Sequence, residues 1–311
     1  MSDLSLELNA VARTIRDVLT EDDFPARIRP PELRDAVLSY PLRGGKRLRP
    51  ALLLWACSMF GGDRASALSA AAAVEVYHNW TLVHDDIIDC DDTRRGLPAT
   101  HMEIAQYAET VLHAPNARAR KFGSDLAILA GDLQQAWAFH LLARTAERGA
   151  KPDLILRLAQ MMQTQLACGL ISGEALDVEF ELRDPTDVEI EDVFRMIDGK
   201  TGAIFRFALH CGAALALGRC EPDEEPFASL SDYALNLARA FQLQDDMLGV
   251  FGSEEEFGKP LCSDFQEAKP TVLFLEAWSR MQPAQKAALG AMLRKPDYRA
   301  DDVRRIRALL A

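Results

Sequence analysis

Apolar residues recur along most of this 311-residue chain at intervals of three or four positions, the spacing of one face of an α-helix. This spacing predicts helices over residues 4–19, 32–39, 50–60, 65–89, 123–145, 152–180, 187–217 and 227–252, and more to residue 311. No series of alternating apolar and polar positions predicts a sheet. Because no linker or repeat separates these segments, we expect one all-α domain over residues 1–311.

Proline and glycine indicate where the helices break. Three prolines interrupt residues 21–31, and the pair Gly61 and Gly62 suits the C-terminal cap of a helix. Residues 101–122 are polar and mixed, with Pro115 in the middle.

Two glycines inside an otherwise apolar helix predict a local kink. Gly199 and Gly202 flank the pair Lys200 and Thr201, and glycine weakens a helix. One interpretation is that the kink aims Lys200 into a cavity. The alternative is an ordinary lysine whose stem lies on apolar surface while its charge reaches water.

The acidic stretch at residues 83–96 carries the strongest chemical signal in the sequence. Asp85 and Asp89 are four positions apart, so on a helix they share one face, and Asp86 lies about 100° round from Asp85. Carboxylates beside an apolar core must be solvated, paired or bound to a metal. Oxygen ligands in this arrangement suit magnesium, whereas the alternative is a solvated helix end.

Basic residues stand next to this acidic stretch and in a second segment before it. Arg94 and Arg95 follow the aspartates directly, and paired guanidinium groups suit phosphate. Lys46 and Arg49 follow two glycines at the predicted start of a helix, a combination that favours anion binding over a solvated turn. His78 lies between the two segments. One interpretation is that it binds the anion, and the alternative is that it is a core histidine with its hydrogen bonds satisfied inside the protein.

Composition and charge narrow the function further. The chain is 49% hydrophobic, which is enough for a large core, and its net charge of −12 does not favour nucleic acid as a partner. Its six cysteines form no CxxC pair, which indicates buried reduced thiols in a cytoplasmic protein. The sequence has no basic segment and apolar run typical of a signal peptide, and no stretch of roughly 20 apolar residues for stable membrane insertion.

Taken together, the polar strings resemble those of the trans-isoprenyl (polyprenyl) diphosphate synthases of short-chain type, the geranylgeranyl and farnesyl diphosphate synthases. The strings GGKRLRP, LVHDDIIDCDDTRRG, DGKTGAIF, FQLQDD and GKP–SDFQEAKPT occur in the order found in that family, from about residue 42 to residue 275. The resemblance implies an all-α isoprenoid synthase-type bundle around a central cavity, a homodimer, and magnesium as cofactor. It also implies head-to-tail condensation of isopentenyl diphosphate with an allylic diphosphate.

Each matching position takes an expected role from the resemblance. The candidate catalytic residues are Asp85, Asp86, Asp89, Lys200 and Asp245. The candidate metal ligands among them are Asp85, Asp89 and Asp245. The candidate contacts to isopentenyl diphosphate are Lys46, Arg49, His78 and Arg95. The candidate contacts to the allylic diphosphate are Arg94, Lys200, Thr201, Gln242, Lys259 and Lys269.

Three features depart from the family pattern. Gly249 replaces the third aspartate of the second aspartate motif, and Glu174 replaces a glutamine. Residues 102–120 look longer than the corresponding segment of most relatives, which suits either a mobile lid or an insertion at the edge of a dimer. A class I terpene cyclase would lack the basic residues expected for isopentenyl diphosphate, and a non-catalytic synthase subunit tends to lose the aspartate motifs.

The residues before Asp85 bear on product length. Tyr77 and Trp80 are the candidates for a floor that limits the growing chain, and the alternative is that both rings are simple core packing. Thr81 is small where many farnesyl diphosphate synthases carry a second aromatic residue. We therefore expect the twenty-carbon geranylgeranyl diphosphate rather than the fifteen-carbon product.

Overall fold

The computed structural model describes residues 3–253, 261–295 and 298–310 and is almost wholly helical there. Its contacts divide the chain into two compact units. The first unit contains Met1–Met162 and Phe207–Ser231, and the second contains Gln163–Arg206 and Asp232–Ala311. The all-α class is confirmed, whereas the single domain over residues 1–311 stays a prediction.

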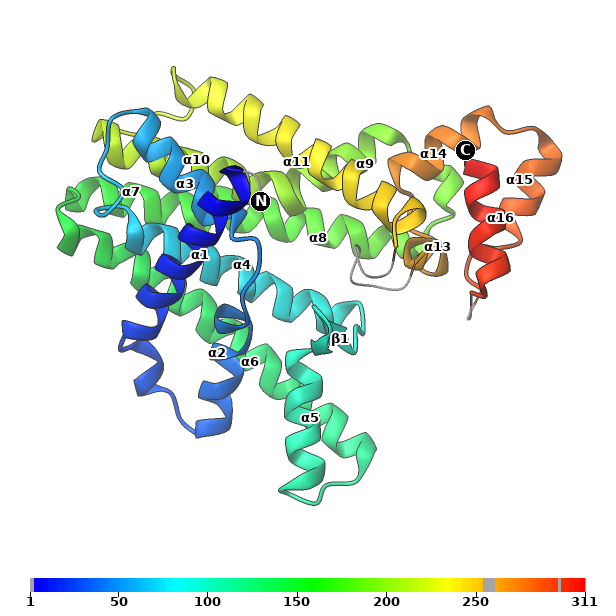
Figure 1. Cartoon of the computed structure of the whole chain (residues 1–311), viewed down its shortest axis with the longest axis horizontal. Coiled ribbons are helices and arrows are strands. Elements are labelled where there is room, and N and C mark those ends of the chain that lie inside the picture. Colours follow the sequence, from blue (N-terminus) through cyan, green and yellow to red (C-terminus); the bar gives the residue numbers. More distant parts are fainter. Residues whose placement is uncertain (1–2, 254–260, 296–297, 311) are drawn as a thin grey trace. The chain divides into compact units, whose positions relative to one another are not determined.

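The first unit is built on the alanine-rich helix α4, which packs against α6 and is flanked by α1, α2 and α3 (Figure 1). Its elements are α1 (Asp3–Glu21), η1 (Phe24–Arg27), α2 (Pro31–Arg43), α3 (Leu48–Met59), α4 (Leu68–Ile88), β1 (Thr93–Arg94), β2 (Leu97–Pro98), α5 (Thr100–Thr110), α6 (Asn116–Arg144), η2 (Thr145–Arg148) and α7 (Pro152–Met161). Four consecutive alanines from Ala70 to Ala73 are fully buried, which lets neighbouring helices approach α4 closely.

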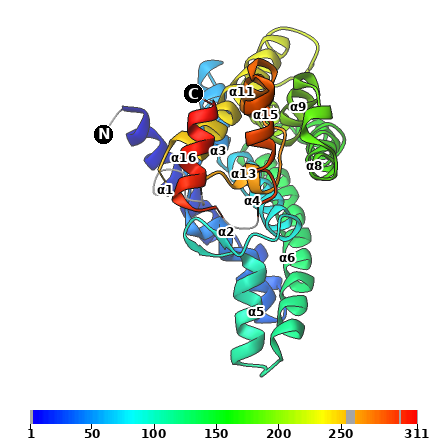
Figure 2. The ribbon, with the colours of Figure 1, turned by 90° about the vertical axis from the view of Figure 1, so that its right-hand side faces the viewer.

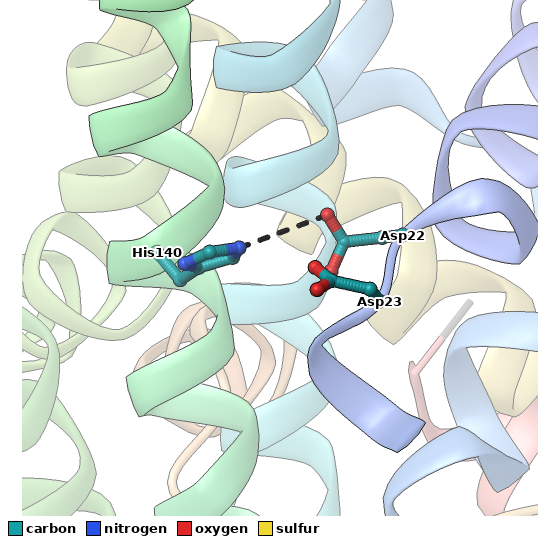
Figure 3. Close-up of side chains that lie close together, drawn as sticks. All are labelled: Asp22, Asp23 and His140. Carbon is teal, nitrogen blue, oxygen red and sulfur yellow. Dashed lines mark ion pairs between the residues drawn. The ribbon is translucent and has the colours of Figure 1, made fainter. Parts of the chain in front are cut away.

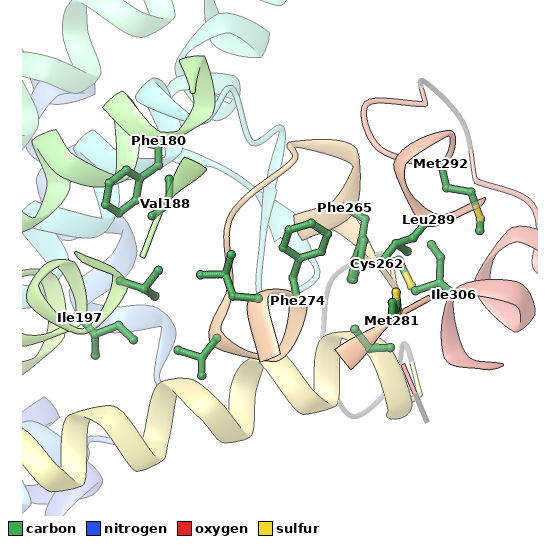
Figure 4. Packing of buried hydrophobic residues seen from close by; sticks show 14 residues of the cluster. Phe180, Val188, Ile197, Cys262, Phe265, Phe274, Met281, Leu289, Met292 and Ile306 are labelled. Atoms are coloured by element: carbon green, nitrogen blue, oxygen red, sulfur yellow. The ribbon is translucent and has the colours of Figure 1, made fainter. Parts of the chain in front are cut away.

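The second unit carries a separate apolar core. Its elements are α8 (Ala167–Leu182), η4 (Pro185–Asp187), α9 (Ile190–Ile197), η5 (Asp198–Gly202), α13 (Ser263–Gln266), α14 (Val272–Arg280), α15 (Pro283–Gly290) and α16 (Ala300–Leu310). A π-helical turn, η3 (Met162–Leu166), precedes α8, and both α10 (Ala203–Leu217) and α11 (Phe227–Phe251) contain residues of each unit. Phe180, Phe265 and Phe274 are buried in this core (Figure 4).

Helix α2 extends beyond its predicted end at residue 39 because the protein compensates for a proline inside it. Pro41 lies within α2 and has no N–H to donate to the carbonyl of Val37. The side-chain amide of Gln134, a buried residue of α6, donates to that carbonyl instead at 2.8 Å. The helix therefore continues to Arg43 without leaving a buried acceptor unsatisfied.

The polar residues 101–122, for which no helix is predicted above, are largely helical. This segment forms α5 and the first turns of α6, and the two helices pack side by side (Figure 2). Pro115 separates them as the N-cap residue of α6 with ψ of 145°, so the proline marks the start of a helix rather than the middle of a loop. The polar composition of the segment reflects its exposed surface.

Smaller differences concern helix ends and cysteines. Helix α3 begins at Leu48 rather than at residue 50, and α4 spans Leu68–Ile88 rather than residues 65–89. Residues 152–182 form one helical run that contains the π turn η3. All six cysteines are free, but Cys90 and Cys168 are exposed, so the prediction of buried thiols holds for four of them.

Asp22, Asp23 and His140 lie close enough together to suggest a metal site (Figure 3). The carboxylate of Asp22 is already occupied, because it accepts hydrogen bonds from Trp137 Nε1 at 2.9 Å, the backbone N–H of Phe24 at 3.0 Å and Arg144 at 2.7 Å. These contacts hold the segment after α1 against α6. The group is thus a structural anchor.

One helical run is long and apolar enough to cross a membrane by length and composition alone. This run is Pro152–Leu182, whose most apolar window has a mean hydropathy of 1.2 and is half buried. The expectation that no stretch has this length and character is therefore corrected. Core helices of other proteins pass the same test, so the run is weak support for a membrane segment.

Candidate active site

The end of α4 keeps two aspartates on one face. Asp85 lies in the last turn, and Asp89 follows the helix with φ of −76° and ψ of −5°. The backbone N–H of Asp89 donates to the carbonyl of Asp85 at 2.8 Å, which continues the helical path through the motif. Carboxylate oxygens of the two residues lie within 4.8 Å of each other, a donor set that suits a magnesium ion.

Asp86 lies on the other side of the helix end and is fully buried. Its Oδ1 accepts a hydrogen bond from Nε of Arg94 at 2.7 Å and a second from Nη2, and its Oδ2 accepts one from the hydroxyl of Tyr40. Burial raises the pKa of Asp86, and the bonds from Arg94 and Tyr40 oppose that rise. Asp86 therefore holds an arginine, whereas Asp85 and Asp89 present carboxylates that could hold a metal ion.

The β1–β2 hairpin places both adjacent arginines. Its two strands pair Thr93 with Pro98 and Arg94 with Leu97. The Arg95 guanidinium donates to the carbonyl of Gly44, in the loop between α2 and α3. A Cβ atom on Gly45 would lie 2.8 Å from Nη1 of Arg95 and would displace the guanidinium group, and the φ of 143° at this position also favours glycine.

A buried ion pair anchors the basic segment to α4, and the sequence analysis missed it. Arg47 is 4% exposed and forms a salt bridge with Glu75, which is 2% exposed. The amide of Asn79 donates to the carboxylate of Glu75 at 3.2 Å. The only sequence signal was a glutamate within an alanine-rich helix, which requires a partner once buried. This anchor leaves the neighbouring Lys46 exposed.

His78 lies within the electrostatic influence of several arginines. Burial lowers its pKa well below the usual value, and the charges of Arg49, Arg95, Arg94 and Arg47 lower it further. The ring is therefore neutral at physiological pH. His78 thus lies near several arginines of the first unit, Arg49 and Arg95 among them.

In the second unit, the predicted kink at Lys200 is the π-helical turn η5. A Cβ atom on Gly173 would lie 2.2 Å from the backbone nitrogen of Lys200, so glycine lets α8 meet the turn closely. The ammonium group of Lys200 lies 2.7 Å from Asp177 Oδ2 and 2.9 Å from Glu174 Oε2. Thr201 is the next residue of the same turn. The interpretation of Lys200 as an ordinary solvent-facing lysine does not fit this pairing.

The acidic end of α11 also belongs to the second unit. Asp245 is half-buried, and Asp246 beside it is 5% exposed. Burial raises the pKa of Asp246 to about 7, although a hydrogen bond from the amide of Gln242, at 2.9 Å, opposes that rise. Lys269 lies 2.9 Å from Glu267. Lys259 lies outside the described residues.

The two candidates for the chain-length floor contact each other inside the first unit. Tyr77 is fully buried and Trp80 is 7% exposed. Their ring centroids are 4.8 Å apart with an interplanar angle of 76°, an edge-to-face contact. The ring of Trp80 also contacts His84 edge-on at 5.9 Å.

Comparison with known proteins identifies the class of this fold and site. The model of the polyprenyl synthetase family matches residues 31–310. The chain therefore belongs to the polyprenyl synthetase family and is a trans-prenyltransferase. This confirms the family resemblance of its motifs.

Individual relatives agree with the family match. The chain is 38% identical over 262 residues to the geranylgeranyl diphosphate synthase of Saccharolobus solfataricus, covering 84% of this chain and 71% of the relative. A geranylgeranyl pyrophosphate synthetase structure from Pyrococcus horikoshii has a TM-score of 0.81 and 32% identity over 99% of this chain and 84% of its own. The structure of the Corynebacterium glutamicum geranylgeranyl pyrophosphate synthase, with isoprenyl diphosphate and magnesium, has a TM-score of 0.81 and 28% identity, covering 99% of this chain and 87% of its own.

Proposed function

We propose that this chain condenses isopentenyl diphosphate head-to-tail with an allylic diphosphate (dimethylallyl, geranyl or farnesyl) and forms mainly geranylgeranyl diphosphate. One observation carries the proposal: the carboxylates of Asp85 and Asp89 share one face, directly before a hairpin that holds Arg94 and Arg95. Metal ligands beside phosphate-binding cations are what the ionisation of an allylic diphosphate requires. The names of the relatives support the twenty-carbon product.

Magnesium is the cofactor in this proposal, and its bound ions would neutralise the leaving diphosphate. The residues that would hold it are Asp85 and Asp89 in the first unit and Asp245 in the second. All three offer carboxylate oxygens, the donors that magnesium prefers. The magnesium-bound relative from Corynebacterium glutamicum supports this choice of metal.

The cationic side chains divide between the two substrates. The proposed contacts to the allylic diphosphate are Arg94, Lys200, Thr201, Gln242, Lys259 and Lys269. The proposed contacts to isopentenyl diphosphate are Lys46, Arg49, His78 and Arg95. His78 enters as a neutral ring, which donates or accepts a hydrogen bond without adding charge.

The assembly and location of the protein belong to the same proposal. We expect a homodimer in the cytoplasm. Helix α6 supports the dimer because three of its large apolar side chains, Ile128, Leu129 and Phe139, are each more than two-fifths exposed. An exposed apolar stripe on a long helix suits burial against a second copy.

A product assay tests the proposed function. Purified protein, magnesium and isopentenyl diphosphate would be incubated with each of the three allylic primers in turn, and the products separated by chain length. We expect geranylgeranyl diphosphate from every primer. The absence of any condensation product with all three primers would refute the proposal, and a fifteen-carbon end product would refute the chain length alone.

A further inference from the structure

The sequence pattern assigns no role to Tyr40, but its hydroxyl group joins three helices. The residue lies near the end of α2 and is 2% exposed. Its hydroxyl donates a hydrogen bond to Oδ2 of Asp86, at the end of α4. The same oxygen accepts a hydrogen bond from the backbone N–H of Thr100, the first residue of α5, at 3.1 Å.

These two partners lie at the two ends of the segment that carries the adjacent arginines. Asp86 precedes strand β1, and Thr100 follows strand β2. Tyr40 therefore ties together the ends of residues 86–100, which limits the conformations of the hairpin between them. Arg43 strengthens the tie, because its Nη1 donates to the carbonyl of Pro98 at 2.7 Å.

Asp86 divides its two oxygens between Tyr40 and the arginine of this hairpin. Oδ2 accepts from Tyr40, while Oδ1 accepts from Nε and Nη2 of Arg94. Because Asp86 is fully buried, bulk water does not replace a lost partner without a rearrangement. The bond from Tyr40 therefore fixes the plane of the carboxylate, and the carboxylate fixes the guanidinium group.

We infer that Tyr40 is a positioning residue for Arg94, holding its guanidinium group in the orientation that receives the allylic diphosphate. This inference rests on the proposed function, which gives Arg94 that role. An alternative orientation, in which the guanidinium group pairs mainly with Asp85, needs little movement, because Nη2 of Arg94 lies 3.0 Å from Oδ2 of Asp85. Without the hydroxyl of Tyr40, the guanidinium group of Arg94 is free to adopt more than one orientation. Ordering it then costs free energy when the substrate binds, which weakens binding.

Steady-state kinetics of Tyr40→Phe test this role, since the variant removes the hydroxyl and keeps the ring. We expect the KM for the allylic diphosphate to rise about tenfold, and the KM for isopentenyl diphosphate to change by less than about twofold. Tyr107→Phe is the matched control. The hydroxyl of Tyr107 donates to Oε1 of Glu32 at 2.8 Å, another tyrosine–carboxylate bond between α5 and α2. This control should leave both KM values unchanged.

A double-variant cycle distinguishes positioning from a general structural role. In an Arg94→Ala background, Tyr40→Phe should cause no further rise in the KM for the allylic diphosphate, because the group that it positions is gone. Effects that multiply in the double variant would overturn the inference. Equal rises for both substrates in the single variant would overturn it as well.

A second variant keeps the inference testable if Tyr40→Phe does not fold. Thr100→Pro removes the N–H that donates to Tyr40, at a first helical position where proline is well tolerated. We expect a smaller rise that is again selective for the allylic diphosphate. An unchanged KM for that substrate would contradict the bridging role of Tyr40.

Calorimetric measurement of inorganic diphosphate binding, with magnesium present, distinguishes a failure of this inference from a failure of the proposed function. A wild-type protein that binds diphosphate but forms no product would contradict the proposed function. The role of Tyr40 would then be tested by the binding measurement alone. Binding to Tyr40→Phe should be about tenfold weaker than to wild type. Equal binding by Tyr40→Phe and wild type would overturn the inference alone.

Discussion

Lys200 and Glu174 form an ion pair within the second unit, with Nζ of the lysine 2.9 Å from Oε2 of the glutamate. The polyprenyl synthase pattern has a glutamine where this chain has Glu174. Oδ2 of Asp177, on the same helix, lies 2.7 Å from Nζ, so the ammonium group of Lys200 is held by two carboxylates. A diphosphate that binds Lys200 must compete with both of these negative charges.

The first prediction follows from that competition. Glu174→Gln should lower the KM for the allylic diphosphate roughly three- to tenfold, because a partly buried ion pair contributes on the order of 1 kcal/mol. Steady-state kinetics with a varied primer measure the effect. Glu179→Gln is the control, since Glu179 is exposed on the same helix. A KM that rises in Glu174→Gln would show that Glu174 takes part in binding instead.

The second prediction concerns the metal. Chelation of divalent ions should abolish turnover, and Asp85→Ala should lower kcat/KM about a thousandfold, the equivalent of losing ~4 kcal/mol of transition-state stabilisation. Asp125→Ala serves as the control because Asp125 is an exposed aspartate that pairs only with Lys121 among the described residues. An Asp85→Ala variant with wild-type activity would remove Asp85 from the metal site.

The third prediction separates the two diphosphate sites. Arg49→Ala should raise the KM for isopentenyl diphosphate far more than that for the primer, since Arg49 belongs to the electropositive group around His78. Lys269→Ala and Lys259→Ala should do the reverse. Initial rates measured with each substrate varied in turn provide the comparison. Equal effects on both substrates in all three variants would mean that the two sites are wrongly assigned.

The fourth prediction concerns stability and rests on the proline in α2. Gln134→Met should lower the free energy of unfolding by about 1–3 kcal/mol, because it leaves the buried carbonyl of Val37 without its donor. Denaturant unfolding measures the change, with Gln135→Met as the control. In a Pro41→Ala background the loss should shrink, since residue 41 then donates to the same carbonyl. An equal loss in both backgrounds would rule out this account of the helix.

The helices were largely predictable because their apolar spacing is long and regular. The kink at Lys200 was also predictable, because two glycines interrupt that spacing. The extension of α2 through Pro41 was not, because it depends on Gln134, a partner almost a hundred positions away. Residues 101–122 carried no predicted helix for a related reason: Pro115 precedes a helix there, and local sequence did not distinguish that from a break.

The residues of the candidate site were predictable where charged residues cluster in the sequence. Site residues that are isolated in the sequence were not predicted. The aspartates and arginines stand in short strings that match a family pattern. Tyr40 and Glu75 stand alone in the sequence, Arg47 is one of several basic residues in its string, and only the folded chain brings the three to their partners. The glutamate at position 174 was visible as a departure, but its pairing with Lys200 required the close approach of α8 at Gly173.

The last prediction concerns product length and the edge-to-face pair of Tyr77 and Trp80. Both rings are buried on α4, within three turns of Asp85, where the helix ends at the candidate metal ligands. If they form the floor of the cavity, replacing either ring by alanine opens space for another five-carbon unit. Tyr77→Ala and Trp80→Ala should therefore each lengthen the main product beyond twenty carbons, and the double variant should lengthen it further.

Chromatography of the products after reaction with an excess of isopentenyl diphosphate measures this change. Leu82→Ala is the control, because Leu82 is partly buried on the same helix but points about 140° away from Tyr77 and about 160° away from Trp80. A product that lengthens equally in the control would indicate general loosening of the core rather than removal of a floor. If neither aromatic replacement lengthens the product, both rings are simple core packing, and another element limits the chain. A wild-type product of thirty carbons or more would contradict the short-chain assignment itself, because two intact aromatic rings would then not be stopping chain growth.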